Sequence, residues 1–326
     1  MMLMQFRVAF VGLFLLTLFA SCTTNEAVTI VRLDQQLFAN SSPDSIRAFL
    51  SRNPGVTQLY FNANDAEIDT TLVPELTNRV SNPALNELNR QVQTEFGDMT
   101  DLRAQLAEAF TNIKKDFPDF KAPEVATIVT GFLGPDIVVT DSLIVIGLDY
   151  FAGPTAKYRP TGSAYPGYIL RRYDKDHIVP AIIFAISDKY NATNRADQTL
   201  LADMVYYGKG YAFTKTMLPT VADSLVIGYT DKQLTETFNA QDIVWAHFID
   251  NQLLYKSDPI TKQQYLNERP FTAEIGPAAP GGIARWIGWR IVSSYYDKKS
   301  ISIAELMRTA DARQIFEQSG YKGQTE

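Results

Sequence analysis

The stretches APEVATIVTGF, residues 122–132, and IVVTDSLIVIGLDYF, residues 137–151, decide the predicted fold. Both are rich in β-branched side chains, which favour strands. They lie close together in the chain and are therefore predicted to form neighbouring strands, the second bent at Gly147. Much of the remaining chain carries apolar residues at spacings of three and four, as amphipathic helices do. A small sheet with a helical remainder predicts one compact, predominantly helical α+β domain.

The predicted helices have recognisable starts and stops. Ser42-Pro43-Asp44 is a typical helix start, and Asn53-Pro54-Gly55 ends the same segment. A helical pattern over residues 82–120 is interrupted by Gly97. Further helices are expected over residues 180–190, 198–214, 231–254, 282–298 and 303–317.

Residues 1–27, MMLMQFRVAFVGLFLLTLFASCTTNEA, have the pattern of an export signal. Arg7 precedes an apolar run that is too short to span a bilayer. Cys22, the only cysteine of the chain, follows Ala20-Ser21, as in a bacterial lipoprotein signal. We therefore expect cleavage before Cys22, acylation of its thiol and new amine, a tether over residues 22–28 and one folded domain over residues 29–326. The alternative is an ordinary signal peptide, residues 1–21, with a chance cysteine.

The composition argues against several classes of function. The net charge is −6 and no basic stripe is present, so nucleic acid is not expected as a partner. The sequence has no HExxH, no GxSxG and no phosphate-binding glycine loop. Neither a cofactor nor a metal is therefore expected. A pair of carboxylates for sugar chemistry could still lie among the 36 acidic residues.

The chain has only two histidines, and they are far apart in the sequence. His177 lies among charged residues in YDKDHIVP, just before a predicted helix, and we expect a loop or capping residue rather than a metal ligand. His247 lies between aromatic residues on a predicted helix, and we expect a partly buried, hydrogen-bonded side chain.

Two stretches are unusually rich in aromatic residues and glycine. They are YRPTGSAYPGYILRRY, residues 158–173, and PAAPGGIARWIGWRIVSSYY, residues 277–296. One interpretation places their rings in the core of the protein. The other predicts a cleft lined by tyrosine and arginine that holds a peptide, a glycan or a loop of a partner.

The order of the motifs resembles that of the gliding-motility lipoprotein B (GldB) family of Bacteroidetes. The matching pieces include LIVIGLDYFAGPTAKYRP, YPGYILRRYDKDHIVPAI, LLADMVYYGKGYAFTKTMLP, IVWAHFIDNQLLYKSD, APGGIARWIGWRIVSSYY and IFEQSGYK. The resemblance implies an envelope lipoprotein required for gliding motility and the linked protein-secretion machinery. Its partners would be the membrane, through the lipid on Cys22, and other envelope proteins of that apparatus. We expect it at the outer membrane, facing the periplasm.

The family is also distantly similar to predicted zinc peptidases of the gluzincin type. In those proteins an HExxH helix would fall at HIVPAIIFAISDKY, and a second helix would carry a glutamate near LLADMVYYGKGYAF. This chain has none of those zinc ligands. In the second segment, the cation Lys209 lies near the position where the zinc-binding glutamate is expected. The resemblance therefore implies a degenerate peptidase-like fold that binds a partner without catalysis. The expected cleft residues are Asp149, Tyr165, Arg171, Arg172, Tyr206, Lys209, Trp286 and Arg290. A hydrolase with unrecognised carboxylates and a purely structural scaffold are the other two hypotheses.

Overall fold

The computed structural model describes residues 26–39 and 41–323. The predicted signal peptide, Cys22 and most of the predicted tether lie outside the described residues. Within the described part, no helix is long and apolar enough to cross a bilayer. Glu26 already contacts the folded chain, because its backbone N–H donates to Thr111 Oγ1 at 2.8 Å.

The sheet has four short strands in the order β1-β2-β4-β3. These are β1 (Ile30–Arg32), β2 (Glu124–Ile128), β4 (Leu143–Gly147) and β3 (Ile137–Val139). The first three run parallel, and β3 is an antiparallel edge strand against β4. The predicted neighbouring strands are therefore present, and β4 ends at Gly147.

The second predicted strand is a hairpin rather than one continuous strand. The prediction missed a turn after β3, which a side chain stabilises. Thr140 donates its N–H to the carbonyl of Leu143 at 2.9 Å, and its hydroxyl accepts the Leu143 N–H at 3.0 Å. This local pairing reverses the chain within a run of β-branched residues.

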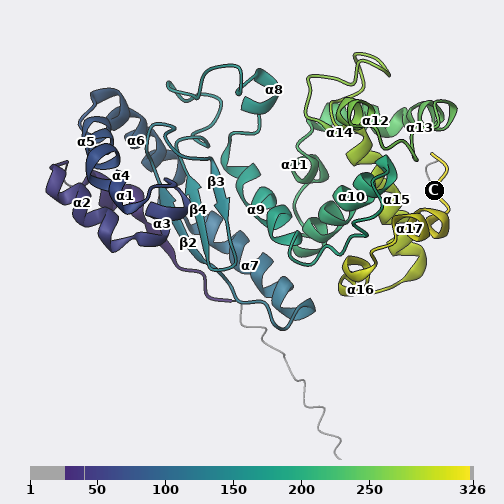
Figure 1. Cartoon of the computed structure of the whole chain (residues 1–326), viewed down its shortest axis with the longest axis horizontal. Coiled ribbons are helices and arrows are strands. Elements are labelled where there is room, and N and C mark those ends of the chain that lie inside the picture. Colours follow the sequence, from purple (N-terminus) through teal and green to yellow (C-terminus); the bar gives the residue numbers. More distant parts are fainter. Residues whose placement is uncertain (1–25, 40, 324–326) are drawn as a thin grey trace, which may run out of the picture.

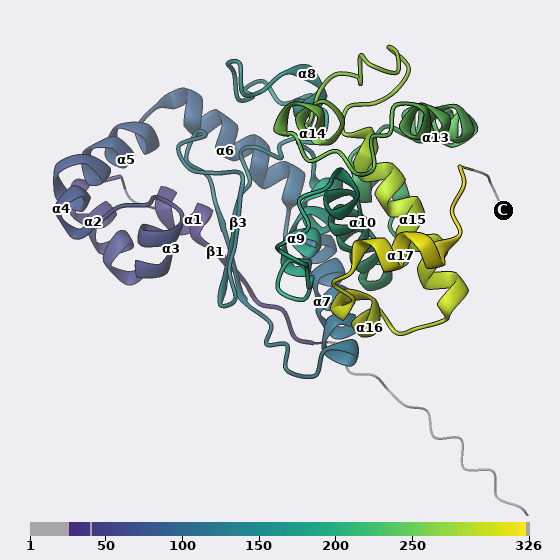
Figure 2. The same cartoon turned by 45° about the vertical axis from the view of Figure 1, so that its right-hand side comes forward.

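The sheet separates two hydrophobic cores because its side chains alternate. Ala126, Ile128 and Val145 pack on the smaller core, whereas Val125 and Ile144 pack on the larger one. The N-terminal helices cover the smaller-core face (Figures 1 and 2). They are α1 (Leu33–Phe38), α2 (Pro43–Arg52), α3 (Pro54–Leu59), α4 (Asp65–Glu67), the π-helical turn η1 (Ile68–Leu72) and α5 (Val73–Val80).

The larger core lies on the other face and contains most of the helices. Those packed nearest the sheet and at the centre are α6 (Pro83–Phe96), α7 (Thr100–Asp116), α9 (Ile178–Ser187), α10 (Leu200–Met217) and α15 (Ile283–Lys299). The others are α8 (Gly167–Leu170), η2 (Lys175–His177), α11 (Asp223–Ile227), α12 (Asp231–Asn239), α13 (Gln241–Asp250), α14 (Pro259–Leu266), α16 (Ile303–Arg308) and α17 (Ala312–Ser319). The predicted α+β class, helical for the most part, is confirmed.

Two of the predicted helices are each split in two. The segment over residues 303–317 contains α16 and α17, because Asp311 begins a new helix by accepting the Gln314 N–H at 3.0 Å. The segment over residues 231–254 contains α12 and α13, which meet at Ala240. The predicted break at Gly97 is confirmed, with a φ of 50° there.

Helices α10 and α15 cross at very close range. Gly208 on α10 and Gly288 on α15 face one another, and a Cβ added at Gly208 would overlap the carbonyl of Gly288. A Cβ added at Gly288 would overlap the carbonyl of Met204. These glycines therefore allow backbone-to-backbone packing at the centre of the larger core.

Candidate functional site

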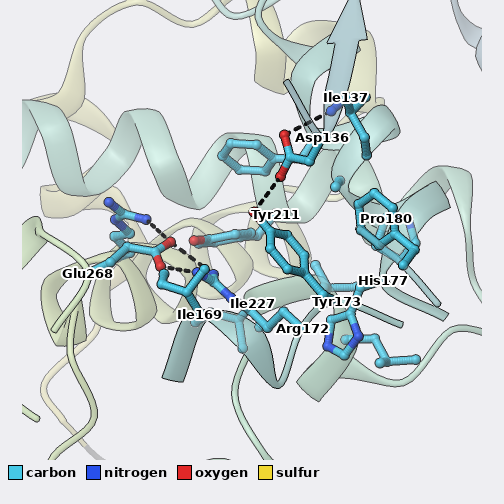
Figure 3. Close-up of a pocket in the computed structure, with 17 residues that line it drawn as sticks. Asp136, Ile137, Ile169, Arg172, Tyr173, His177, Pro180, Tyr211, Ile227 and Glu268 are labelled. Atoms are coloured by element: carbon cyan, nitrogen blue, oxygen red, sulfur yellow. Dashed lines mark hydrogen bonds and ion pairs between the residues drawn. The ribbon is translucent and has the colours of Figure 1, made fainter. Parts of the chain in front are cut away.

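A cavity of about 430 Å³ lies between the sheet edge and the helices of the larger core (Figure 3). Its volume is within the range of small-ligand sites, about 300–1,000 Å³. The apolar part of its wall comes from Ile137, Phe151, Ile169, Pro180, Ala181, Phe184, Leu225, Val226 and Ile227. Its polar and charged lining residues are Asp136, Arg172, Tyr173, His177, Tyr211, Glu268 and Arg285.

One end of the cavity is built around Glu268, which follows α14. Its Oε1 accepts from Arg172 Nη1 at 2.9 Å and from Arg285 Nη1 at 3.4 Å. Its Oε2 accepts from Arg172 Nη2, so the Arg172 pair is bidentate. Burial by itself would raise the pKa of Glu268, but the two arginines outweigh it and hold the pKa below its ordinary value.

This end continues into a smaller cavity of about 30 Å³ that is rich in arginine. Four arginines line it, namely Arg171, Arg172, Arg269 and Arg285. Among its described lining residues, Glu268 is the only acid. Arg269 is paired with Glu274 at 3.0 Å, whereas the buried Nε atoms of Arg171 and Arg285 have no hydrogen-bond partner in the described structure. We call Arg171, Arg172, Glu268 and Arg285 the arginine end; its net charge is positive.

Burial has a clear effect on Arg171. It lowers the pKa of the guanidinium, and the neighbouring charge of Arg172 lowers it further. An anion placed here would relieve both effects, since it would supply an opposite charge and hydrogen-bond acceptors.

The other side of the cavity carries different polar groups (Figure 3). Tyr173 donates its hydroxyl to Asp136 Oδ2 at 3.1 Å, and the other oxygen of Asp136 accepts the Ile137 N–H at 2.8 Å. His177 Nδ1 lies 2.7 Å from Asp174 Oδ1. In the described part of the chain, no three His, Cys, Asp or Glu side chains form a group that could hold a metal ion.

Both histidines lie where the sequence indicated. His177 ends η2 and occupies the N-cap position of α9, although its side chain does not cap the helix. His247 is half-buried, and its Nε2 is 2.8 Å from the hydroxyl of Tyr265.

Three of the predicted cleft residues lie at or beside the cavity. Arg172 lines it, Arg171 lines the adjoining smaller cavity, and Tyr165 packs on the rings of Tyr150 and Tyr173 with centroids 6.2 Å apart in each pair. The aromatic stretch that contains them therefore contributes both to the core and to the cavity wall.

The other five predicted residues do not line this cavity. Tyr206 and Lys209 line a separate cavity of about 450 Å³, and Trp286 and Arg290 line another of about 300 Å³. Trp286 is buried in the core, and Arg290 stacks over the ring of Phe238 at 4.6 Å. Tyr206 donates its hydroxyl to Asp188 at 2.6 Å. The eight residues are thus distributed over several places in the fold.

Lys209 has a structural environment. It is 1 % exposed, and its ammonium donates to the carbonyls of Ala192 at 2.7 Å, Thr309 at 2.9 Å and Met307 at 3.2 Å. The side chain therefore ties α10 to the loop after α9 and to the end of α16. Burial lowers its pKa to about 8.

Asp149, which follows β4, is also buried in a structural position. Its Oδ2 accepts the backbone N–H groups of Thr130 at 3.0 Å and Phe132 at 2.8 Å, and its buried Oδ1 has no partner in the described structure. The carboxyl thereby fixes the turn after β2, where Phe132 has a φ of 65°.

Asp149 should make stability depend on pH. Burial raises the pKa of its carboxyl, so the folded chain binds this proton more tightly than the unfolded chain. Relative to Asp149→Asn, the unfolding free energy of the wild type should therefore fall as pH rises from about 4 through the raised pKa. The expected slope is roughly 1.4 kcal/mol for each pH unit between the pKa of Asp149 in the unfolded chain and its pKa in the folded chain. Urea unfolding at a series of pH values measures this difference. The control is Asp250→Asn, because Asp250 is exposed. If the difference in unfolding free energy between the wild type and Asp149→Asn did not change with pH, the prediction would be contradicted.

Sequence reasoning missed several residues of the site. Glu268 lies in an ordinary loop, LNERPF, and no sequence signal marks it. Arg285 lies within the second aromatic stretch but outside the helix face formed by Ile283, Trp286, Ile287 and Arg290. Tyr173 ends the first aromatic stretch but was not among the expected cleft residues, and Asp136 and Tyr211 carry no distinguishing signal. Their common feature, proximity to one cavity, exists only in the folded chain.

The sequence model of a family described as gliding motility protein GldB matches residues 20–323. No curated protein matches the chain, and no solved structure matches it either.

Proposed function

The chain belongs to the gliding motility protein GldB family, and from this premise we propose that it binds a partner of the motility apparatus in the 430 Å³ cavity without catalysing a reaction there. Family membership identifies a gliding-motility lipoprotein of the cell envelope. The proposal adds where the partner binds and what the site does.

The observation that carries the proposal is the arginine end of a cavity whose wall is largely apolar and carries a few further polar groups. Apolar walls with a few convergent charged groups are typical of binding sites. Arginine is frequent among the residues that dominate binding energy, because it stacks, forms bidentate pairs and stays charged. The cavity combines these features across elements that are distant in sequence, from Arg172 before η2 to Arg285 on α15.

The cavity carboxylates support binding rather than acid–base catalysis. Glu268 is held by two guanidinium groups, which lower its pKa and make it a weak base near neutral pH. Asp136 accepts from Tyr173 and from the Ile137 N–H. Both groups thus have structural contacts that a general base would have to give up.

We extend the proposal to the origin of the cleft. Helix α9 borders the cavity through Pro180, Ala181 and Phe184, in the segment where the distant zinc-peptidase resemblance would put its ligand helix. On α10, Lys209 is engaged with backbone carbonyls. A peptidase-like cleft that has lost its chemistry and kept a binding role accounts for both. A lipid on Cys22 and a position at the outer membrane, facing the periplasm, complete the proposal.

The test is gliding by cells that carry Arg172→Met in the full-length lipoprotein. This change removes the charge and preserves much of the side-chain length. We expect that these cells no longer glide and that the variant no longer cross-links to its envelope partner. The amount of the variant in the envelope should be unchanged, and its unfolding midpoint should lie within a few degrees of that of the wild type. The matched control is Arg313→Met, because Arg313 also pairs with a glutamate, Glu317 at 3.0 Å, but is well exposed on α17.

Normal gliding with Arg172→Met would refute the proposed binding site. Turnover of envelope peptides or glycans by the purified wild type, abolished by Arg172→Met, would instead favour the hydrolase hypothesis. Loss of folding in Arg172→Met would favour the scaffold hypothesis.

A further inference from the structure

We propose that the ligand of the cavity is the free C-terminal end of a polypeptide, with its α-carboxylate bound at the arginine end and its last apolar side chain in the middle of the cavity. This inference rests on the proposed function and specifies the chemistry of the partner. Charge, unsatisfied donors, a helix terminus and the distribution of polar groups support it.

The first argument is charge. Arg171, Arg172 and Arg285 bring three positive charges to the arginine end, and Glu268 brings one negative charge, so two positive charges remain. Guanidinium groups bind carboxylates through two parallel hydrogen bonds, as the pair between Arg172 and Glu268 already does. A second carboxylate fits the charge that Glu268 leaves uncompensated.

The second argument is the unused hydrogen-bond donors. The Nε atoms of Arg171 and Arg285 are buried without a partner within residues 26–39 and 41–323. A buried donor without an acceptor is unfavourable by about 1–3 kcal/mol. Both arginines line the small cavity next to Glu268, so two donors that the described structure leaves unpaired belong to the residues around the place proposed for the carboxylate.

The third argument is the position of α15. This helix of 17 residues begins at Ile283, directly after Gly281 and Gly282, which line the same small cavity. Its N-cap residue, Gly282, has no side chain that could cap the helix. The free N–H groups and the dipole of a helix N-terminus favour an anion. The helix terminus and the arginines thus favour the same kind of ligand at one place.

The distribution of polar groups favours a peptide over a lipid. Figure 3 shows Glu268 on one side of the cavity and Asp136 and His177 on the other. A hydrocarbon tail that left the arginine end would be buried against the polar groups of Asp136 and Tyr173, which is unfavourable. A peptide offers N–H donors to the Asp136 carboxylate along its length.

The experiment compares a free C-terminus with a blocked one. The probe is a dansylated hexapeptide mixture that ends in leucine, prepared as the free acid and as the amide, and binding to the full-length lipoprotein in detergent is followed by fluorescence anisotropy. We expect the acid to bind at least tenfold more tightly than the amide. The ratio should approach one in Arg172→Met, should fall only in part in the charge-retaining Arg285→Lys, and should be unchanged in Arg313→Met.

Each other result overturns the inference. If acid and amide bound equally and independently of the arginines, the cavity would bind a peptide without recognising its C-terminal carboxylate. The inference would then be wrong, and the proposed function would survive. Binding of lysophosphatidate or octanoate in place of both peptides, lost in Arg172→Met, would identify a lipid anion. No binding of any probe, together with normal gliding of Arg172→Met cells, would refute the inference and the proposed function together. Unfolding curves are recorded for each variant, so that a misfolded protein can be distinguished from one that has lost only peptide binding. Arg285→Lys is the second variant because it keeps the positive charge.

Discussion

Replacing Gly288 by alanine should destabilise the folded chain by roughly 3 kcal/mol, the upper part of the usual range for overpacking. The added methyl group would overlap the backbone carbonyl of Met204 on α10, and no side-chain rotation can relieve a clash with the backbone. Helices α10 and α15 would have to move apart, and their shared core would loosen. Urea unfolding of the full chain, followed by circular dichroism, measures the loss.

The matched control for this change is Gly167→Ala on α8. A Cβ at Gly167 would meet nothing within 4 Å, so the same chemical substitution should change stability by less than about 0.5 kcal/mol. Gly208→Ala should behave like Gly288→Ala, because it presses on the same crossing from the other helix. Wild-type stability in Gly288→Ala would show that the two helices are not packed this closely.

Replacing Lys209 by methionine should also cost roughly 3 kcal/mol of unfolding free energy. The carbonyls of Ala192, Met307 and Thr309 would lose their donor, and each buried carbonyl without a partner costs about 1–3 kcal/mol. Relief of the buried charge offsets part of this loss. The control is Lys232→Met, since the Lys232 side chain is 81 % exposed, and urea unfolding at pH 7 compares the two.

The same lysine gives a second readout through pH. Burial lowers the pKa of Lys209 from 10.5 to about 8, so between these values the unfolded chain holds more protons than the folded chain. The stability of the wild type should therefore rise with pH over this window, relative to Lys209→Met, and should be independent of this group below pH 8. A relative stability that falls from pH 8 to 10 would contradict the buried position of the ammonium.

The sheet and several helix ends could be predicted because their signals are local. β-Branched runs form β2 and β4, Ser42 and Pro43 begin α2, and Gly97 ends α6. The hairpin turn at Thr140 was missed because a polar side chain replaces the glycine that usually marks such a turn. The break between α12 and α13 has no glycine or proline to mark it.

Only part of the site could be predicted, and charge was the informative signal. The pair Arg171-Arg172 stands out because it follows an aromatic loop. The partner of Arg172, Glu268, lies 96 residues further along the chain, and only the tertiary fold brings them together. Lys209 also carries an unusual charge for its apolar helix, but its partners are backbone carbonyls, which no residue type in a sequence can reveal.

The hydrogen bond between Glu26 and Thr111 bears on how the molecule stands on a membrane. If Cys22 carries the lipid, the acylated position is four steps along the chain from Glu26, which is bonded to α7, and four extended steps reach about 14 Å. The folded body would then stay close to the bilayer surface, within roughly the length of that short segment. The chain enters the sheet at the end remote from α8, which borders the cavity (Figure 1). Such a short attachment would turn the arginine end outward, so its ligand would arrive from the aqueous side.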